Sequence, residues 1–252
     1  MNRATSAALA TLSLLAITAL TACGGTGNAD SGADPATTAP SAKAPTAAEH
    51  LARTMVTTSD VKGLRVAEPD DEFRFARTPD EVTLDQPVCA PLALAMNQLP
   101  LGDPEADLTR VVSGQRDTGS PGTETANGIG FTYVTLTAHR SGGAQSAFAG
   151  VRKAVESCGG GFTAESKGAN GAKAPYDSVT AERVTPAGDD SLGFKATMTS
   201  QGVPHVLHTE VVRSGDILAV HFSVDGLAIA DRRPSDAKLS PTVVNAQNRK
   251  LG

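Results

Sequence analysis

Much of this chain alternates between apolar and polar residues, which is the pattern of half-buried β-strands. In residues 216–224, for example, Leu218 and Phe222 fall on one face, while His221 and Ser223 fall on the other. The segments with this period of two predict strands. They are residues 72–77, 108–116, 130–139, 179–184, 191–199, 205–213 and 216–224.

A second pattern predicts helices between these strands. Ala144, Phe148, Val151 and Val155 recur with a period near 3.6, and Gly159-Gly160-Gly161 ends that helix. Further helices are expected at residues 49–55, 91–99 and 241–250. Pro91 and Pro241 suit the first turns of the last two, and Ser240 suits the cap before Pro241.

The order of these elements predicts the fold class. The last two strands flank Ser214-Gly215, which favours a tight hairpin and therefore antiparallel pairing. Runs of strands interrupted by helices indicate an α+β domain, which we expect to have one layer of helices over an antiparallel sheet. Residues 49–252 suit one such domain.

The N-terminus reads as an export signal followed by an anchor. Residues 1–22 carry one charge, Arg3, and an apolar stretch that ends at Leu20-Thr21-Ala22-Cys23. That run resembles the lipobox of bacterial lipoproteins, which implies cleavage before Cys23 and attachment of acyl chains such as palmitate. The expected location is the extracytoplasmic face of the cell membrane, with lipid as the anchor. The alternatives are an ordinary secretory signal with a coincidental cysteine, and an uncleaved anchor.

Composition separates the anchor from the domain. Residues 23–48 are rich in Gly, Ala, Thr and Pro without apolar periodicity, so we expect a disordered tether.

The chain has three cysteines, and lipidation of Cys23 leaves Cys89 and Cys158. An even remainder in an exported protein predicts a disulfide between two helix ends. Two buried free thiols or a redox pair are the alternatives.

The overall charge excludes one class of partner. The formal net charge is −5, aromatic residues make up 4% of the chain, and Trp is absent. Because no run of Lys or Arg appears, we expect no nucleic-acid partner. The sequence also lacks a Gly-rich phosphate loop and a Gly-x-Ser-x-Gly elbow, so we expect no cofactor and no enzymatic activity.

Three side chains are the best candidates for a ligand site. His208 and Glu210 share a face of one expected strand, and His221 can lie across the hairpin from them. Such a cluster suits a metal or proton transfer, although a solvated polar sheet face is the simpler interpretation. His205 points to the opposite face from His208 and does not join this group. Asp189-Asp190 also suits acid–base chemistry or calcium, but its position in a turn explains both residues.

Several segments, taken in order, resemble a known family. They are Leu51 to Gly63, Cys89 at the start of a helix, Tyr133-Val134-Thr135-Leu136, the helix ending at Cys158, Asp189-Asp190-Ser191-Leu192-Gly193, and Ala246 to Leu251. This order is similar to the PknH-like extracellular sensor domains of actinobacterial serine/threonine kinases, which also occur as free-standing lipoproteins. A broader relative is the PsbP-like lipoprotein group. The resemblance implies a twisted antiparallel sheet, disulfide stapling and a cleft for an unknown ligand. Family members often carry two bridges, whereas this chain has cysteines for one.

These observations lead to three hypotheses. The first is a membrane-anchored sensor or ligand-binding domain without enzymatic activity. The second is an envelope hydrolase or metal-dependent enzyme that uses the region of His208, Glu210 and His221. The third is a module that binds another envelope protein. Their expected partners are, beside the membrane, an unknown small ligand or an envelope protein.

Overall fold

The computed structural model describes residues 44–71, 74–114, 131–168 and 171–252. The predicted signal peptide, Cys23 and most of the predicted tether lie outside the described residues. Everything below concerns the described part of the chain, and within it no helix is long and apolar enough to cross a membrane.

The described residues form one ten-stranded sheet in the order β1-β3-β4-β9-β8-β7-β6-β5-β2, with β10 beside β8. All neighbours pair antiparallel except β10 and β8, which are parallel. The strands are β1 (Leu64–Ala67), β2 (Val82–Leu84), β3 (Ala106–Gly114), β4 (Phe131–Ala138), β5 (Phe162–Ser166), β6 (Lys173–Glu182), β7 (Asp190–Ser200), β8 (Val203–Ser214), β9 (Ile217–Val224) and β10 (Ser235–Ala237). The predicted α+β class with a large antiparallel sheet is confirmed.

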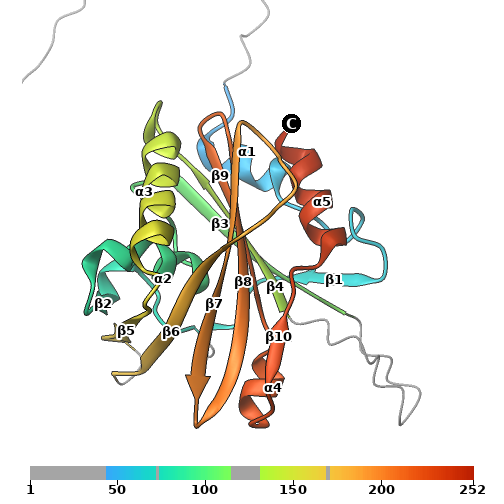
Figure 1. The fold of residues 1–252 in the computed structure, drawn as a ribbon. Coiled ribbons are helices and arrows are strands. Elements are labelled where there is room, and N and C mark those ends of the chain that lie inside the picture. The colour runs from blue at the N-terminus through green and yellow to red at the C-terminus, as the bar shows by residue number, and fades with distance from the viewer. Residues whose placement is uncertain (1–43, 72–73, 115–130, 169–170) are drawn as a thin grey trace, which may run out of the picture. The chain divides into compact units, whose positions relative to one another are not determined.

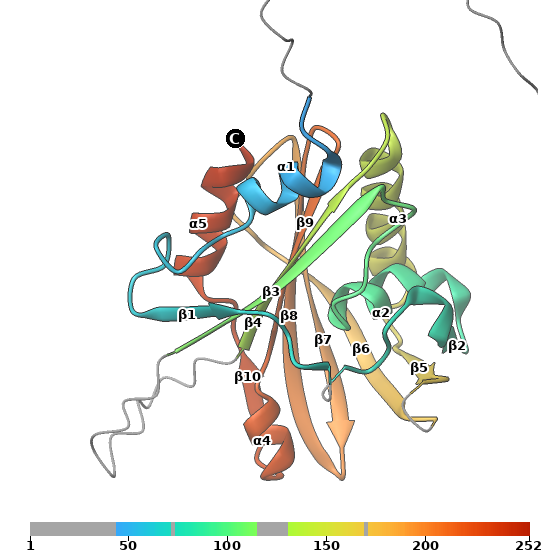
Figure 2. The same cartoon turned by 180° about the vertical axis from the view of Figure 1, so that it is seen from behind.

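Five α-helices accompany the sheet, which is strongly twisted, so that β3 runs obliquely to β6 and β7 (Figures 1 and 2). They are α1 (Ala47–Thr54), α2 (Ala90–Met96), α3 (Gly143–Ser157), α4 (Gly226–Ala230) and α5 (Pro241–Leu251), with two short 3₁₀ turns, η2 (Pro79–Glu81) and η3 (Pro87–Cys89). The expectation of one helical layer is wrong. α2 and α3 cover one face, whereas α1 and α5 cover the other, because both faces of the central strands carry apolar side chains.

The core under α2 and α3 contains the predicted disulfide. Cys89 ends η3 just before α2, Cys158 caps α3, and the bridge between them joins Cα atoms 6.0 Å apart. Phe148 of α3 packs in the same cluster as Phe194 of β7 and Leu218 of β9, all three essentially buried. The disulfide prediction is confirmed, and the bridge holds two helices together over this face of the sheet.

The core on the opposite face joins the two ends of the described chain. Leu51 of α1 and Val243 of α5 pack against Val134, Val212 and other central-strand residues. A capping box starts α1, where the Thr46 side chain accepts from the backbone of Glu49 and the Glu49 carboxylate accepts from that of Thr46. Because Val243 and Ala246 of α5 belong to this second core, the core fixes α5 on the sheet.

β8 and β9 form the predicted hairpin, but its turn lies at Gly215-Asp216 rather than at Ser214-Gly215. Ser214 pairs with Ile217, and Gly215 between them has a φ of 56°, a conformation that favours glycine. The expected strand at residues 72–77 is wrong where it can be assessed, because residues 74–77 are not in a strand. Two alternating phenylalanines had suggested it, and Phe73 lies outside the described residues.

Candidate functional site

A groove of about 650 Å³ lies over β8, between α5 and the connection that joins β6 to β7. Figure 1 shows this connection passing beside α5. The connection packs closely against β7 because residue 193 is glycine. A Cβ atom at Gly193 would overlap the side chain of Val184 in the connection. The lining residues used below are Glu182, Arg183, Val184, Ala187, His208, Glu210, Lys238, Leu239, Val244, Asn245, Asn248 and Arg249.

Glu210 forms part of the floor of this groove. It lies on β8 directly opposite Gly193 of β7 and is only 5% exposed. Its Oε1 accepts a hydrogen bond of 3.2 Å from Nδ2 of Asn248 on α5. Burial raises the pKa of the Glu210 carboxyl, and the hydrogen bond from Asn248 only partly opposes this. A desolvated carboxyl in a groove is a typical feature of a functional site.

His208 lies on the same face of β8, two residues away from Glu210, and is 2% exposed. Its Nδ1 lies 2.7 Å from Oε2 of Glu182, and its Nε2 lies 2.6 Å from Oδ1 of Asp236. Lys238 completes the cluster, with Nζ 3.0 Å from the other carboxylate oxygen of Asp236. The ring donates to both carboxylates only when both nitrogens carry a proton. His208 therefore holds β6, β8 and the segment around β10 together.

The neighbours of Asp236 lower the pKa of its carboxyl. Burial favours the neutral acid, but hydrogen bonds from His208 and Lys238 outweigh it, so the pKa of Asp236 lies below its usual value. Nζ of Lys238 also lies 3.2 Å from Nε2 of His208, so Glu182, Asp236 and Lys238 all contact the same imidazole ring.

His221 lies on β9 directly opposite Glu210. The sequence placed it across the hairpin without indicating which residue it would face. Its side chain is fully buried and does not line the groove. No described residue lies within hydrogen-bonding distance of either ring nitrogen. Burial lowers the pKa of His221 to about 4, so the ring is neutral at physiological pH.

The three candidates therefore share one sheet face but not one site. Glu210 and His208 reach the groove, whereas His221 lies beneath the packed elements. Both nitrogens of His208 already face carboxylates, so neither histidine presents a free ring nitrogen to the groove. In the described part of the chain no three His, Cys, Asp or Glu side chains are arranged to hold a metal ion.

The sequence reasoning missed the other groups of the site, which are Glu182, Asp236, Lys238 and Asn248. Glu182 lies within the expected strand 179–184, where a polar residue on the solvent face is too common to single it out. Asn248 had a clearer signal, because it breaks the apolar face of α5 next to Gln247. Nothing along the chain indicated that either residue would meet β8.

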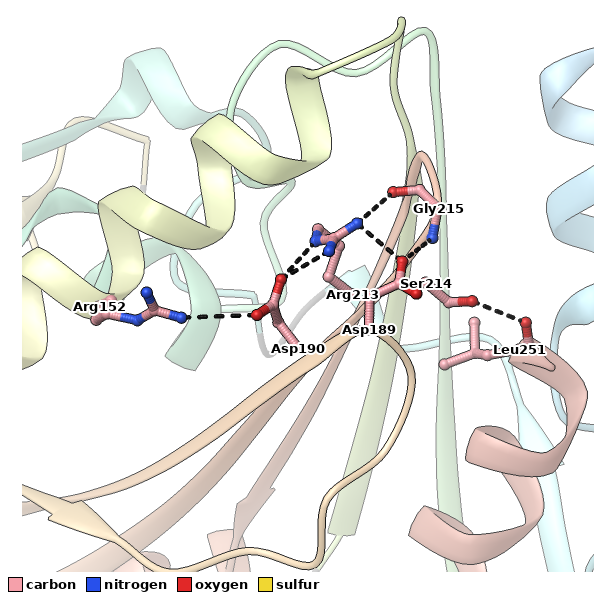
Figure 3. Close-up of polar contacts among 7 residues, drawn as sticks. All are labelled: Arg152, Asp189, Asp190, Arg213, Ser214, Gly215 and Leu251. Atoms are coloured by element: carbon pink, nitrogen blue, oxygen red, sulfur yellow. Dashed lines mark hydrogen bonds and ion pairs between the residues drawn. The ribbon is translucent and has the colours of Figure 1, made fainter.

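Asp189 and Asp190 have a structural role at the start of β7, away from the groove lining. Figure 3 shows Arg213 of β8 between them. Arg213 donates to Asp190 Oδ2 from Nε at 2.9 Å and from Nη2 at 2.7 Å, and to Asp189 Oδ2 from Nη1 at 2.9 Å. Asp189 also accepts from the backbone N–H of Gly215 at 2.8 Å. Through Arg213 and Gly215 the pair fixes the β8–β9 turn.

Comparisons with known proteins give a structural likeness but no match to a family model. No curated protein matches the sequence either. Among solved structures, the extracellular domain of PknH from Mycobacterium tuberculosis is similar, with 12% sequence identity and a TM-score of 0.46 over 82% of this chain and 95% of that one. This neighbour is an extracellular domain of a PknH kinase, the group that the sequence motifs resemble.

Proposed function

We propose that this chain is a lipid-anchored, extracytoplasmic domain that binds a small ligand in the groove beside α5 and has no catalytic role. The observation that carries the proposal is the groove itself. Its volume of about 650 Å³ is in the range of small-molecule sites. A desolvated carboxyl, Glu210, lies on its floor among apolar side chains, which is the composition expected of a site that orients a ligand.

The chemistry of the site favours binding over catalysis. A general base needs a nitrogen or oxygen within reach of the reacting proton. Both nitrogens of His208 face carboxylates at 2.7 and 2.6 Å, and the ring of His221 is buried away from the groove. Neither histidine is therefore available in the groove as a general base, which argues against the enzyme hypothesis. A concave groove likewise favours a small ligand over the flat contact of a protein-interaction module.

Two features support the proposed location. Disulfides persist in oxidising compartments outside the cytoplasm, and the bridge of Cys89 and Cys158 is of this kind. The N-terminal sequence adds the run that ends at Cys23. Signalling from such a domain needs a partner.

The anchor is tested by fractionation of cells that express the full chain. Wild type is expected in the membrane fraction, with mass spectrometry finding a mature N-terminus at Cys23 that carries acyl chains. Cys23→Ala is expected to lose both the acyl chains and processing at this site, whereas Thr26→Ala in the same segment keeps them. Acyl-free wild-type protein overturns this part of the proposal.

The groove is tested by a fragment screen read out as thermal stabilisation and as amide shifts in NMR spectra. Asn245 is exposed on α5 and lines the groove, so Asn245→Trp fills it without disturbing the core. Lys153→Trp, on the exposed side of α3, is the matched control. Fragments are expected to bind wild type and the control but not Asn245→Trp. If every fragment binds all three proteins equally, the groove is not the site.

A further inference from the structure

The charged side chains around His208 contact one another, whereas the carboxyl at the floor of the groove stands apart from them. Glu182 and Asp236 face His208 and Lys238 at hydrogen-bonding distance. Glu210 has no cationic partner among the described residues, although it is 5% exposed. A buried carboxylate without a counter-charge is costly, and a bound cation removes that cost.

A second acceptor accompanies Glu210. Asn248 uses its Nδ2 for the bond to Glu210, and its Oδ1 is buried with no donor among the described residues. Unpaired buried acceptors are rare in native proteins and indicate a missing donor, such as a ligand group. An ammonium group suits this arrangement, because it has three donors, no acceptor and one positive charge.

The apolar residues of the lining indicate the chemistry of the uncharged part of the ligand. Val184, Ala187, Leu239 and Val244 give one part of the groove an apolar surface. A short hydrocarbon chain attached to the charged group fits there. The ligand expected from this lining is therefore an amphiphilic amine rather than a fully polar ion.

We infer that the groove selects ligands that carry an ammonium group joined to a hydrocarbon part, with Glu210 and Oδ1 of Asn248 as the acceptors. This inference rests on the proposed function, because it names the chemistry of the same groove. Arg183 and Arg249 also line the groove, but both are exposed, so water and salt screen their charges. The desolvated carboxylate at the floor therefore decides which charge is accepted.

The experiment uses three probes of equal chain length: hexylamine, which is protonated at neutral pH, hexanoate and 1-hexanol. Each is titrated into the folded protein while NMR follows the amides of residues 208–212 and 245–249. Hexylammonium is expected to shift these amides and to bind more tightly than the other two probes. Glu210→Gln keeps the size and the contact with Asn248 but removes the charge, and is expected to weaken hexylammonium binding about tenfold or more.

The matched control is Glu156→Gln, on the exposed side of α3 across the sheet, which is expected to bind all three probes as wild type does. If hexanoate or hexanol binds the groove as tightly as hexylammonium, or if Glu210→Gln binds it undiminished, the inference is overturned while the proposed function stands. The probe comparison in wild type decides the question even if the Glu210 variant does not fold. Absence of groove shifts with hexylammonium also overturns the inference, and the fragment screen then decides the proposed function.

Discussion

The side chain of Gln247 and the backbone of Val56 are joined although 191 residues separate them: Gln247 Oε1 accepts a hydrogen bond of 2.8 Å from the Val56 N–H. The Nε2 atom of the same side chain donates to the carbonyl oxygen of Thr54 at 3.0 Å. Gln247 is fully buried. It therefore satisfies one backbone group in the last residue of α1 and one just beyond it, and it fixes α5, the helix that forms one wall of the groove.

Replacing Gln247 by leucine is expected to destabilise the domain. The change keeps the approximate size but leaves the Val56 N–H and the Thr54 carbonyl buried without partners, each of which costs about 1–3 kcal/mol. We expect a loss of roughly 2 kcal/mol or more in the free energy of unfolding, measured by urea denaturation. Gln145→Leu, at an exposed position of α3, is expected to change it by less than about 0.5 kcal/mol. Equal stability of the two variants would show that the buried bonds contribute nothing.

Most of the long elements of this fold were predictable because they carry their own periodic pattern, but β6 was predicted only over residues 179–182. β4, β7, β8, β9 and α3 all lie where the alternation or the helical period placed them. The three-residue strands β2 and β10 were not predicted. Such strands exist only because a longer neighbour pairs with them, as β8 does with Ser235 to Ala237, and no local pattern records that pairing.

The candidate site was predictable only in part. The alternation placed His208 and Glu210 on one face of a strand, but the predicted hairpin did not fix which residue His221 would face. In the structure that residue is Glu210. Which of the two reaches the groove depends on the elements packed over the sheet. The partners of Glu210 and His208 come from distant segments, since Asn248 lies 38 residues after Glu210 and Asp236 lies 28 residues after His208. Sequence spacing carries no record of such contacts.

Acid is expected to destabilise the domain through His221. Its pKa is about 4 in the folded protein against 6.5 ordinarily, because burial favours the neutral ring. The unfolded chain therefore binds this proton first. The free energy of unfolding is unaffected by this titration above pH 6.5. As the pH falls from 6.5 towards 4, His221 lowers it by roughly 3 kcal/mol in total. The raised pKa of Glu210 acts in the opposite direction, because the folded state takes up that proton first.

Comparison of wild type with His221→Leu isolates the contribution of His221, since Glu210 and the buried His139 remain in both. Leucine fills the space without the two unpaired ring nitrogens, so we expect the free energy of unfolding to change little at neutral pH. Below pH 6.5 we expect this free energy, measured by urea denaturation, to fall less steeply than in wild type; this acidic part of the curve is called the acid limb. His50→Leu, at an exposed position of α1, should leave the acid limb unchanged. Parallel acid limbs for wild type and His221→Leu would contradict the prediction.

Reduction of the disulfide is expected to weaken the domain. The bridge closes a loop between residues 69 apart, and such a loop is worth about 4 kcal/mol in the chain-entropy model. We expect dithiothreitol to lower the free energy of unfolding of wild type by about this amount. The Cys89→Ala/Cys158→Ala double variant should start less stable and not respond to the reductant. An undiminished wild-type stability, with both thiols shown by mass spectrometry to be reduced, would contradict this.

Gly161, between α3 and β5, is expected to tolerate no side chain. Its φ is 84°, which favours glycine, and a Cβ atom there would overlap the backbone carbonyl of Tyr176 on β6. Gly160 next to it has no such φ, and a Cβ atom at that position would meet nothing within 4 Å. We therefore expect Gly161→Ala to lower the free energy of unfolding by about 2 kcal/mol or more, and Gly160→Ala to change it little. Urea denaturation of the two variants side by side provides the measurement, and similar values for both would show that the backbone at Gly161 adapts to a methyl group.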